Sequence, residues 1–568
     1  MVPLVKHKLM EMPIYYLPNG RLFAYYHEKP KLKFRPIISH LLIEKFGKGP
    51  FSTEVITETL FFAFDWYSQE FMKILNEQNE VSFYQALFGL HEFASKSHQE
   101  NPNKSPIPQM DDQDFALYRR ILKLCLEQAC DIPLVRNIPF PTPEFLKSKE
   151  LIIEDLMYLG DFLYEFSDLL AQQHMIEDCV DLLFTDKDLF YFTYKHHYGF
   201  IIQETLKEIN SHLDEAIIGG NDFEDFKTAL EHCHGMSYEQ IISTIILMHE
   251  RNEKQGGKMA MEEWYAYPKN LELLFDIPDN KAKDIFGGLT LTKENKMSLK
   301  DAIFKPYHIN KYLYRPILVW NVKGVDRAIV GEFIFNEAIV SLYSNAFGWN
   351  KYPSEWDNEC FKSYIKAKVV VNDKILEDAA ELALNKQNVL YDRNITNLKK
   401  WNNQNINIHN DKCGEIDLLF VLNDKLYICD SKHLISRYDM NNFRNDYAAF
   451  ETAKKAYNKT MRRKVAFLLE NISHIQEHFQ VLKNDRTLNV ELKSVEGCFV
   501  VNTPTFVMYN NEYRIYTIKS FKEFLNGTFE DTTFQLLIDD EEKQTLLQVQ
   551  YPYFRKPDYL VFNPEAED

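Results

Sequence analysis

Apolar residues recur every three or four positions through much of the first half of the chain. This spacing puts them on one face of a helix, so residues 1–285 are predicted to be mainly α-helical. The segments with the clearest pattern are 144–170, 199–217 and 222–251. Loops are predicted where prolines, glycines and polar residues interrupt the pattern, at 101–108, 139–143 and 256–257. We expect this helical region to have a recognition or regulatory role.

The pattern becomes strand-like between residues 286 and 354. Two short runs rich in Ile, Val and Phe, 316–320 and 328–335, flank a Lys-Gly turn at 323–324. Such runs on either side of a glycine turn predict a β-hairpin. A short helix is expected next, over 335–347, and the segment as a whole is interpreted as a β-containing connector.

Charged residues interrupt two short apolar runs in the C-terminal part of the chain. The runs are Gly414–Phe420, which contains Asp417, and Leu426–Lys432, which contains Asp430. Their composition is that of buried strands, and ionised side chains are seldom buried unless they are paired or bind a metal. Asp417, Asp430 and Lys432 are therefore candidate site residues.

A hairpin would bring these three side chains together. Side chains alternate between the faces of a strand, so Asp430 and Lys432 share one face. A turn at 423–424 would pair the two strands and place Asp417 beside Asp430. Two carboxylates and a backbone carbonyl, here that of Ser431, are ligands that Mg²⁺ prefers. We therefore expect a metal site of Asp417, Asp430 and Ser431 that holds Mg²⁺, for which Mn²⁺ can substitute.

An aspartate, a gap of twelve residues and then Asp-Ser-Lys is a spacing that resembles the restriction-endonuclease-like PD-(D/E)xK nuclease superfamily. The resemblance covers residues 355–525 and implies a mixed central sheet flanked by helices, with the site on a central hairpin. That superfamily usually adds an acid from the preceding helix, a position that Glu377 matches, with Glu381 as a substitute one turn later. Ile416 stands before Asp417 where the family often has proline.

The pattern of an acid, any residue and a lysine also occurs elsewhere in the chain. It is found at 279–281, 491–493 and 541–543. The tripeptide alone is therefore a weak signal. The candidate differs from the other three in the apolar residues that precede it, the upstream strand with Asp417 and the preceding helix with its acids. The alternative is that Asp430 and Lys432 form only a salt bridge on an edge strand. A long helix over 441–471 and a strand over 495–501 complete the predicted order of elements.

We therefore predict a multidomain protein. At 568 residues with 45% hydrophobic content, the chain is long enough to bury several cores. The mainly α-helical N-terminal region, 1–285, precedes the connector, 286–354. A C-terminal α/β restriction-endonuclease-like domain with a mixed central sheet is expected over 355–525, followed by a C-terminal extension, 526–568.

A basic run follows the hairpin, although the formal net charge of the chain is −18. Its basic residues are Lys454, Lys455, Lys459, Arg462, Arg463 and Lys464. Helical spacing would place Lys455, Lys459 and Arg462 on one face, and basic side chains beside a metal site suit the phosphates of nucleic acid. We expect Lys455, Lys459, Arg462 and Arg463 to bind nucleic acid. The alternative is a solvated helix face without a partner.

The resemblance implies metal-dependent hydrolysis of phosphodiester bonds, with DNA as the expected substrate of an endonuclease or exonuclease. Asp417 and Asp430 would hold Mg²⁺, Lys432 would orient the attacking water, and Glu377 would hold an outer-sphere water or a second cation. Family analogy suggests a bacterial defence or DNA-processing effector. Two alternatives stay open: an RNA-cleaving nuclease of the same fold, and a non-catalytic helical interaction protein with a degenerate nuclease domain.

Composition restricts the other possibilities. The acidic net charge favours a protein partner for the N-terminal region. No apolar run approaches the about 18 residues needed to span a bilayer, and the N-terminal segment lacks an apolar signal core, so a cytoplasmic protein without a membrane partner is expected. The eight cysteines include no Cys-x-x-Cys pair, so neither zinc nor disulfides are predicted, and the cysteines are interpreted as buried thiols.

Overall fold

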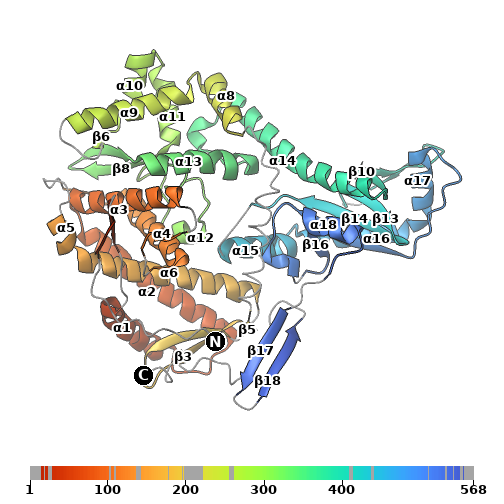
Figure 1. The fold of residues 1–568 in the computed structure, drawn as a ribbon, viewed down its shortest axis with the longest axis horizontal. Coiled ribbons are helices and arrows are strands. Elements are labelled where there is room, and N and C mark those ends of the chain that lie inside the picture. The colour runs from red at the N-terminus through yellow and green to blue at the C-terminus, as the bar shows by residue number, and fades with distance from the viewer. Residues whose placement is uncertain are drawn as a thin grey trace. The chain divides into compact units, whose positions relative to one another are not determined.

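The computed structural model divides into two compact units. Unit 1 comprises residues 1–170, 182–192 and 221–365, and unit 2 comprises residues 171–181, 193–220 and 366–568. Figure 1 shows the elements of both units. The structure describes residues 14–17, 20–23, 28–101, 104–107, 110–135, 143–176, 178–194, 196–197, 222–254, 261–408, 413–435, 440–509, 511–530, 534–540, 543–549 and 554–555.

Unit 1 is mainly helical over its described residues, as the apolar spacing predicts (Figure 1). Its helices are α1 (Glu28–Phe46), α2 (Thr53–Glu77), α3 (Val81–Glu100), α4 (Asp112–Ala129), α5 (Pro143–Ser148), α6 (Glu150–Met175), α8 (Asp222–His234), α9 (Tyr238–Lys254), α10 (Ala266–Phe275), α11 (Asp279–Gly288), α12 (Leu299–Phe304) and α13 (Glu332–Asn345). In α2, Ser52 caps the first turn by accepting a hydrogen bond from the Val55 N–H. Ile56, Leu60 and Phe64 then recur on the buried face of α2, which explains why this segment folds as a helix against the core.

Two of the predicted helices are divided. Residues 144–170 form parts of α5 and α6, which separate at Lys149, and residues 222–251 form α8 and part of α9. Gly235 follows α8 with a φ of +70°, and its N–H donates to the Glu231 carbonyl at 2.9 Å. A glycine in this left-handed conformation is a common helix terminator, so the break has a local cause.

The predicted loop over 101–108 lies between α3 and α4, where the described residues form no helix. Of the predicted loop 139–143, only Pro143 is described, and it begins α5, a position that proline tolerates. The predicted helix 199–217 and the predicted loop 256–257 lie outside the described residues.

A four-stranded sheet in unit 1 contains the predicted hairpin (Figure 1). Its strands, in order across the sheet, are β6 (Met261–Glu263), β9 (Val325–Val330), β8 (Ile317–Val322) and β7 (Thr290–Leu291). Lys323 and Gly324 form the turn between β8 and β9 with φ values of +52° and +82°, which suit a two-residue hairpin turn. The sheet shares one hydrophobic core with α8 to α11 and α13, so the predicted connector is an integral part of unit 1.

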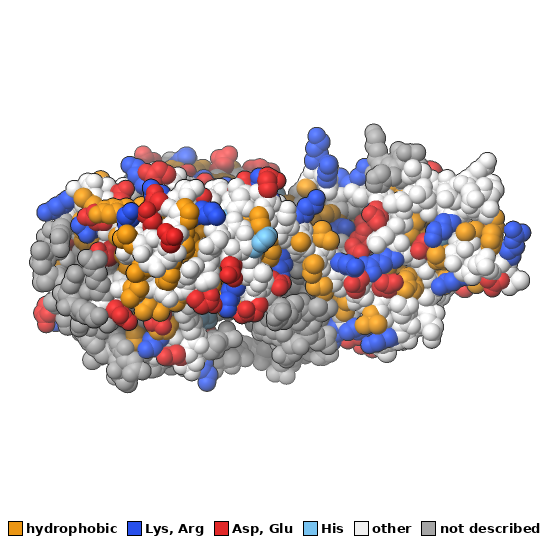
Figure 2. All heavy atoms as spheres, turned by 90° about the horizontal axis from the view of Figure 1, so that it is seen from above, with side chains coloured by type: hydrophobic (Ala, Val, Ile, Leu, Met, Phe, Trp, Pro, Cys, Tyr) orange, Lys and Arg blue, Asp and Glu red, His pale blue; other side chains and the backbone are white. Residues whose placement is uncertain are grey.

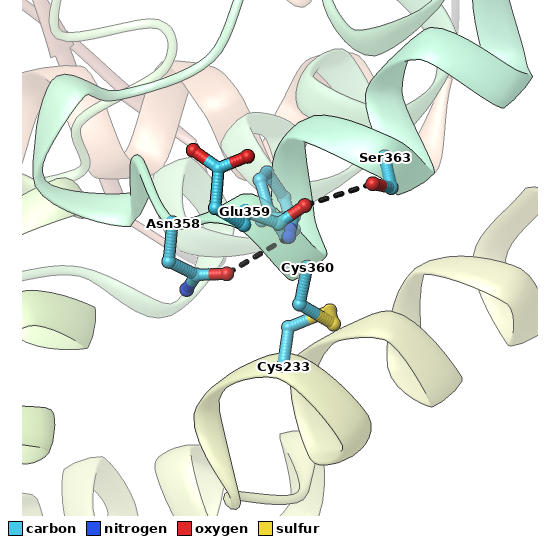
Figure 3. The surroundings of a disulfide bond; sticks show 6 residues. Cys233, Asn358, Glu359, Cys360 and Ser363 are labelled. Carbon is cyan, nitrogen blue, oxygen red and sulfur yellow. Dashed lines mark hydrogen bonds between the residues drawn. A yellow bond between two sulfur atoms is a disulfide. The ribbon is translucent and has the colours of Figure 1, made fainter.

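A disulfide joins Cys233 of α8 to Cys360 in the first turn of α14 (Glu359–Lys386), with Cα atoms 5.3 Å apart (Figure 3). The prediction of unpaired thiols is wrong for these two cysteines. They are 127 residues apart in sequence, so no local spacing signals the pair, and tertiary packing alone brings them together. The other six cysteines are buried thiols, as predicted, and they are Cys125, Cys130, Cys179, Cys413, Cys429 and Cys498.

A mixed five-stranded sheet forms the centre of unit 2 (Figure 1). Its strands, in order across the sheet, are β10 (Leu390–Ile395), β13 (Ile416–Leu422), β14 (Lys425–Lys432), β15 (Ser494–Val501) and β16 (Arg514–Thr517). The pairs β10–β13 and β13–β14 are antiparallel, and the pairs β14–β15 and β15–β16 are parallel. The predicted hairpin and the predicted strand over 495–501 are therefore confirmed.

Helices cover both faces of this sheet. On one face α14 and α18 (Ile518–Leu525) pack against the strands, and Ala380 of α14 shares a core with Leu418 of β13. On the other face lie α16 (Tyr457–Glu470) and α17 (Ile475–Lys483), and Met461 of α16 shares a core with Leu419 and Ile428. Figure 1 shows α14 running along one side of the strands. Because side chains alternate along β13 and β14, each strand contributes to both cores.

The predicted long helix over 441–471 is broken. Its residues form α15 (Met440–Tyr447), a short π-helical turn at Ala448–Thr452 and then α16. Ala453, with φ and ψ of −60° and 153°, ends the π-helical turn in extended backbone, and this is the physical reason why one helix does not continue.

The other short strands form two-stranded pairs. These are β1 (Ile14–Leu17) with β2 (Gly20–Phe23), β3 (Val180–Phe184) with β4 (Phe190–Tyr194), β5 (His196–His197) with β19 (Phe554–Arg555), β11 (Asn397–Leu398) with β12 (Ile406–Asn407), and β17 (Phe534–Asp540) with β18 (Lys543–Val549). Within the C-terminal extension, β17 and β18 thus form a hairpin of their own and are not strands of the central sheet. Among the helices that the structure describes, none combines the length and apolar character needed to cross a bilayer.

Candidate metal and phosphate site

The β13–β14 hairpin places the two predicted aspartates opposite each other. Asn423 and Asp424 form its turn with φ values of +50° and +60°, a conformation that Asn and Asp tolerate better than most residues. The register pairs Leu418 with Cys429, and continuing it by one residue sets Asp417 opposite Asp430. The sequence-based expectation for the geometry of this hairpin therefore agrees with the structure.

Asp417, Asp430 and Lys432 meet on the face of the sheet that α16 covers. The Lys432 Nζ atom lies 3.9 Å from Asp417 Oδ2 and 3.5 Å from Asp430 Oδ2. Asp417 Oδ2 also accepts a hydrogen bond of 2.7 Å from the Ser431 N–H. The Lys432 ammonium donates to the Ser431 carbonyl at 3.1 Å and lies 5.3 Å from the centre of the Tyr457 ring. One ammonium group thus bridges both carboxylates.

Lys464 is a site residue that the sequence interpretation missed. Its Nζ atom donates to both oxygens of Asp430, at 2.7 Å each, and to the Glu415 carbonyl. The residue is only 3% exposed. The sequence held a signal, because Lys464 follows Met461 by three positions and precedes Leu468 by four, so it shares their buried face of α16. Lys464 is therefore a buried member of a run whose other basic residues on α16 are exposed.

Close packing of α16 on β15 explains how Lys464 reaches Asp430. Gly497 of β15 lies beneath α16, and a Cβ atom at this position would come within 2.6 Å of Met461 Cγ. Glycine therefore lets the helix approach the sheet more closely than a larger residue would. Gly497 pairs with Ile428, two residues before Asp430, so the close approach lies beside the charged cluster.

The two carboxylates have opposite pKa shifts. Burial, reinforced by the neighbouring Asp430, raises the pKa of Asp417 to about 6. Burial also acts on Asp430, but the ammonium groups of Lys432 and Lys464 outweigh it and lower the pKa of Asp430. For Lys432, the two carboxylates outweigh burial and raise the pKa of the ammonium. Adjacent acids whose pKa values are driven apart are typical of sites that handle protons or cations.

The structure does not bring Glu377 to these aspartates. Glu377 belongs to α14, which covers the opposite face of the sheet, and its Oε2 lies 2.8 Å from Arg393 of β10. The same guanidinium binds Asp378 at 2.5 Å and Glu381 at 2.6 Å. Arg393 pairs with Leu418 in the β10–β13 register, and Leu418 lies on the face of the sheet that α14 covers. Arg393 therefore lies on the same face. The expected acid from the preceding helix, and its substitute Glu381, are thus both bound to an arginine.

The predicted nucleic-acid-binding residues have different environments. Lys455 lies in the turn before α16 and not on the helix face where its spacing from Lys459 would put it. Lys459 and Arg463 are exposed on α16, while Arg462 forms an ion pair with Glu512. Lys455, Lys459 and Arg463 have no acidic partner among the residues that the structure describes. Figure 2 shows acidic and basic side chains interspersed on the face that it presents.

The donor atoms present are of the kind that Mg²⁺ takes. Two carboxylates face each other, and the Ser431 carbonyl lies beside them. Over the described part of the chain, however, no cluster of three or more Asp, Glu, His or Cys side chains is suited to a metal. Both oxygens of Asp430 are also hydrogen-bonded to Lys464. The donor chemistry therefore fits a hard cation, on the condition that Lys464 yields at least one oxygen of Asp430.

No protein-family model, curated protein or solved structure matches this chain. The geometry of the site is consequently the basis for any functional conclusion.

Proposed function

We propose that unit 2 contains a restriction-endonuclease-like nuclease domain that hydrolyses phosphodiester bonds, with DNA as its substrate and Mg²⁺ as its cofactor. One observation carries the proposal. A single ammonium group, that of Lys432, lies 3.9 Å from Asp417 and 3.5 Å from Asp430 on one face of a buried hairpin. Acids and a lysine in this arrangement suit a phosphodiester bound next to a metal ion.

The order of elements supports the proposed fold. Helix α14 precedes the antiparallel strands β10, β13 and β14, and α15 and α16 then lead into β15, which is parallel to β14. This is the helix, strand, hairpin, helix and strand order that the resemblance implies for residues 355–525. Charged residues that meet on a central hairpin of a mixed sheet are a second feature in common.

Each residue has a role that follows from its position. Asp417 and Asp430 would hold the cation, and bound Mg²⁺ would lower the pKa of a coordinated water and offset charge on the scissile phosphate. Lys432 is anchored by the Ser431 carbonyl and by both acids, so its ammonium is preorganised toward the place where negative charge develops. Glu377 receives no role in this reaction, because Arg393 binds it on the other face.

The basic group of α16 and its preceding turn suggests where nucleic acid would lie. Lys455, Lys459 and Arg463 are exposed and belong to the same segment as Lys464, which contacts Asp430. Phosphate contacts of this kind carry no base information, so RNA is a second possible substrate of the same chemistry. We propose that the helical unit 1 contacts a protein partner, as in a defence or DNA-processing effector.

A second candidate function is a non-catalytic interaction protein with a degenerate nuclease domain. The ion pairs favour it directly: Lys464 binds both oxygens of Asp430, and Arg393 binds Glu377. Each of these contacts pairs a carboxylate with a cation without a metal, and the contact between Lys464 and Asp430 is buried. The two candidates differ in one property, which is metal-dependent cleavage.

The deciding experiment incubates the purified full chain with plasmid, linear duplex DNA, single-stranded DNA and RNA, in Mg²⁺ or in EDTA. The proposal predicts Mg²⁺-dependent loss of DNA, and the variant Asp430→Asn should abolish that loss. Lys483→Met, at an exposed lysine in the last turn of α17, is the control and should still cut. If no substrate is degraded in Mg²⁺, the non-catalytic alternative is correct.

A further inference from the structure

The cluster at the hairpin is already neutral before any metal binds. Two carboxylates, those of Asp417 and Asp430, face two ammonium groups, those of Lys432 and Lys464. The resemblance to nucleases accounts for one of these lysines, Lys432. Lys464 comes from α16 and supplies a second positive charge next to the same two acids.

Lys464 occupies the ligand atoms of Asp430 as a cation would. Its ammonium is 2.7 Å from each oxygen of Asp430, and its third partner is the Glu415 carbonyl. Side-chain exposure is 4% for both Lys464 and Asp430, so the ammonium cannot exchange Asp430 for water without moving. A divalent ion on Asp430 must therefore compete with a buried ammonium group that is fully hydrogen-bonded.

Charge balance determines when that competition succeeds. Adding a divalent ion to a neutral buried cluster leaves an excess of two positive charges, which low-dielectric surroundings penalise. A phosphodiester brought next to the ion supplies negative charge and reduces the excess. Without Lys464, the cluster would carry one net negative charge and would attract a divalent ion by itself.

We infer that Lys464 is a built-in competitor of the metal, which makes cation binding at Asp417 and Asp430 depend on a bound phosphate. This inference rests on the proposed function and specifies how its metal site is regulated. Metal and phosphate then bind cooperatively, and each raises the affinity of the other by the same factor. In the absence of nucleic acid, the protein holds Lys464 on Asp430 and has little metal.

The test measures binding of Mn²⁺ to the full-length protein by electron paramagnetic resonance of the free ion, without any cleavage step. The wild type should bind Mn²⁺ weakly, and Lys464→Met should bind it at least about tenfold more tightly because the competing ammonium is gone. Lys483→Met, at an exposed lysine of α17, should match the wild type. Asp430→Asn combined with Lys464→Met should lose the gained affinity. Equal or weaker binding by Lys464→Met would overturn the inference.

The wild type alone decides a second measurement, and the variant Lys464→Met adds a comparison. Thymidine 5′-monophosphate has a phosphate but no phosphodiester bond to cut, and a saturating amount should tighten Mn²⁺ binding by the wild type at least about tenfold. The same nucleotide should change binding by Lys464→Met much less. Wild-type affinity that does not respond to the nucleotide contradicts the inference.

The outcomes separate this inference from the proposed function. A wild type that binds Mn²⁺ tightly without phosphate, and also cuts DNA, would refute the competitor role of Lys464 and leave the nuclease proposal intact. A wild type that neither binds Mn²⁺ under any of these conditions nor cuts any nucleic acid would refute both.

Discussion

Each unit buries a cluster of charges, and the two clusters differ in how many cationic partners each carboxylate has. In unit 1, Glu337 of α13 accepts hydrogen bonds from Arg119 at 2.9 Å and from Lys123 at 2.7 Å. Burial would raise the pKa of Glu337, but Lys123 and Arg119 outweigh it and lower this pKa to about 2. In unit 2, two acids and two lysines contact one another, and the pKa values of Asp417 and Asp430 shift in opposite directions.

The comparison shows that burial of charge is not by itself the mark of a functional site. Glu337 is a single carboxylate with two cationic partners, and this arrangement is a satisfied structural ion pair. The hairpin cluster instead places two carboxylates around one ammonium group, with Lys432 Nζ 3.9 Å from Asp417 Oδ2 and 3.5 Å from Asp430 Oδ2. Two carboxylates that share one ammonium group, rather than buried acids as such, distinguish the candidate site.

Removal of one lysine from each cluster should have the largest effect. Lys432→Met should lower the rate of Mg²⁺-dependent DNA cleavage by about 10³-fold, because preorganised charge next to the phosphate is lost. Lys123→Met should leave the cleavage rate unchanged, since Arg119 still pairs with Glu337. Initial rates of plasmid cleavage measure both variants. A similar loss of activity in the two would show that the difference between the clusters has no functional meaning.

Removal of a carboxylate should affect stability more in unit 1 than in unit 2. Glu337→Ala leaves Arg119 and Lys123 buried without their acid and should lower the free energy of unfolding by about 3–5 kcal/mol. Asp417→Asn should change it by less than about 1 kcal/mol, because burial already disfavours the charged form of Asp417.

Urea unfolding measures both of these variants. Five of the six tryptophans fall within the residues of unit 1, so fluorescence reports mainly on unit 1, and circular dichroism covers the whole chain. If Asp417→Asn destabilised the protein as much as Glu337→Ala does, the ion pairs of Asp417 would stabilise the fold as much as those of Glu337.

Acid should destabilise unit 1 through Glu337. Its folded-state pKa of about 2 lies below the ordinary value of 4.5, so its contribution to stability is present above pH 4.5 and is lost as pH falls toward 2. The loss amounts to about 3 kcal/mol. Urea unfolding of wild type and Glu337→Gln across this pH range should give curves that converge at low pH. A constant difference between them would mean that Glu337 is not ionised in the folded state.

The smallest effect is expected on the α14 face of unit 2. Glu377→Gln should leave the cleavage rate within about a factor of two, because a residue that touches neither metal nor substrate adds nothing in the transition state. Asp378→Asn is the matched control, since Asp378 binds the same guanidinium of Arg393. If Glu377→Gln lost activity and Asp378→Asn did not, Glu377 would belong to the site as the sequence suggests.

Local signals in the sequence predicted much of the fold of unit 2 and part of the candidate site. The alternation of apolar and charged residues, with a turn at Asn423 and Asp424, was enough to place Asp417 opposite Asp430, because strand pairing and turn geometry are local properties. The strand over 495–501 followed from its apolar composition in the same way.

The missed features all depend on contacts between distant segments. Lys464 reaches Asp430 only because α16 packs closely on the sheet. Arg393 forms its ion pair with Glu377 only because β10 pairs with β13. The disulfide between Cys233 and Cys360 spans 127 residues. In each case the residue type is visible in the sequence, but its partner is chosen by the tertiary fold.

Cleavage of supercoiled plasmid by wild type and Asp430→Asn, side by side in Mg²⁺ and in EDTA, shows whether the hairpin cluster is a metal-dependent nuclease site. We expect nicked or linear DNA only for the wild type in Mg²⁺, with the variant inactive yet folded by circular dichroism. Equal cleavage by the two proteins, or cleavage by the wild type that persists in EDTA, would contradict it.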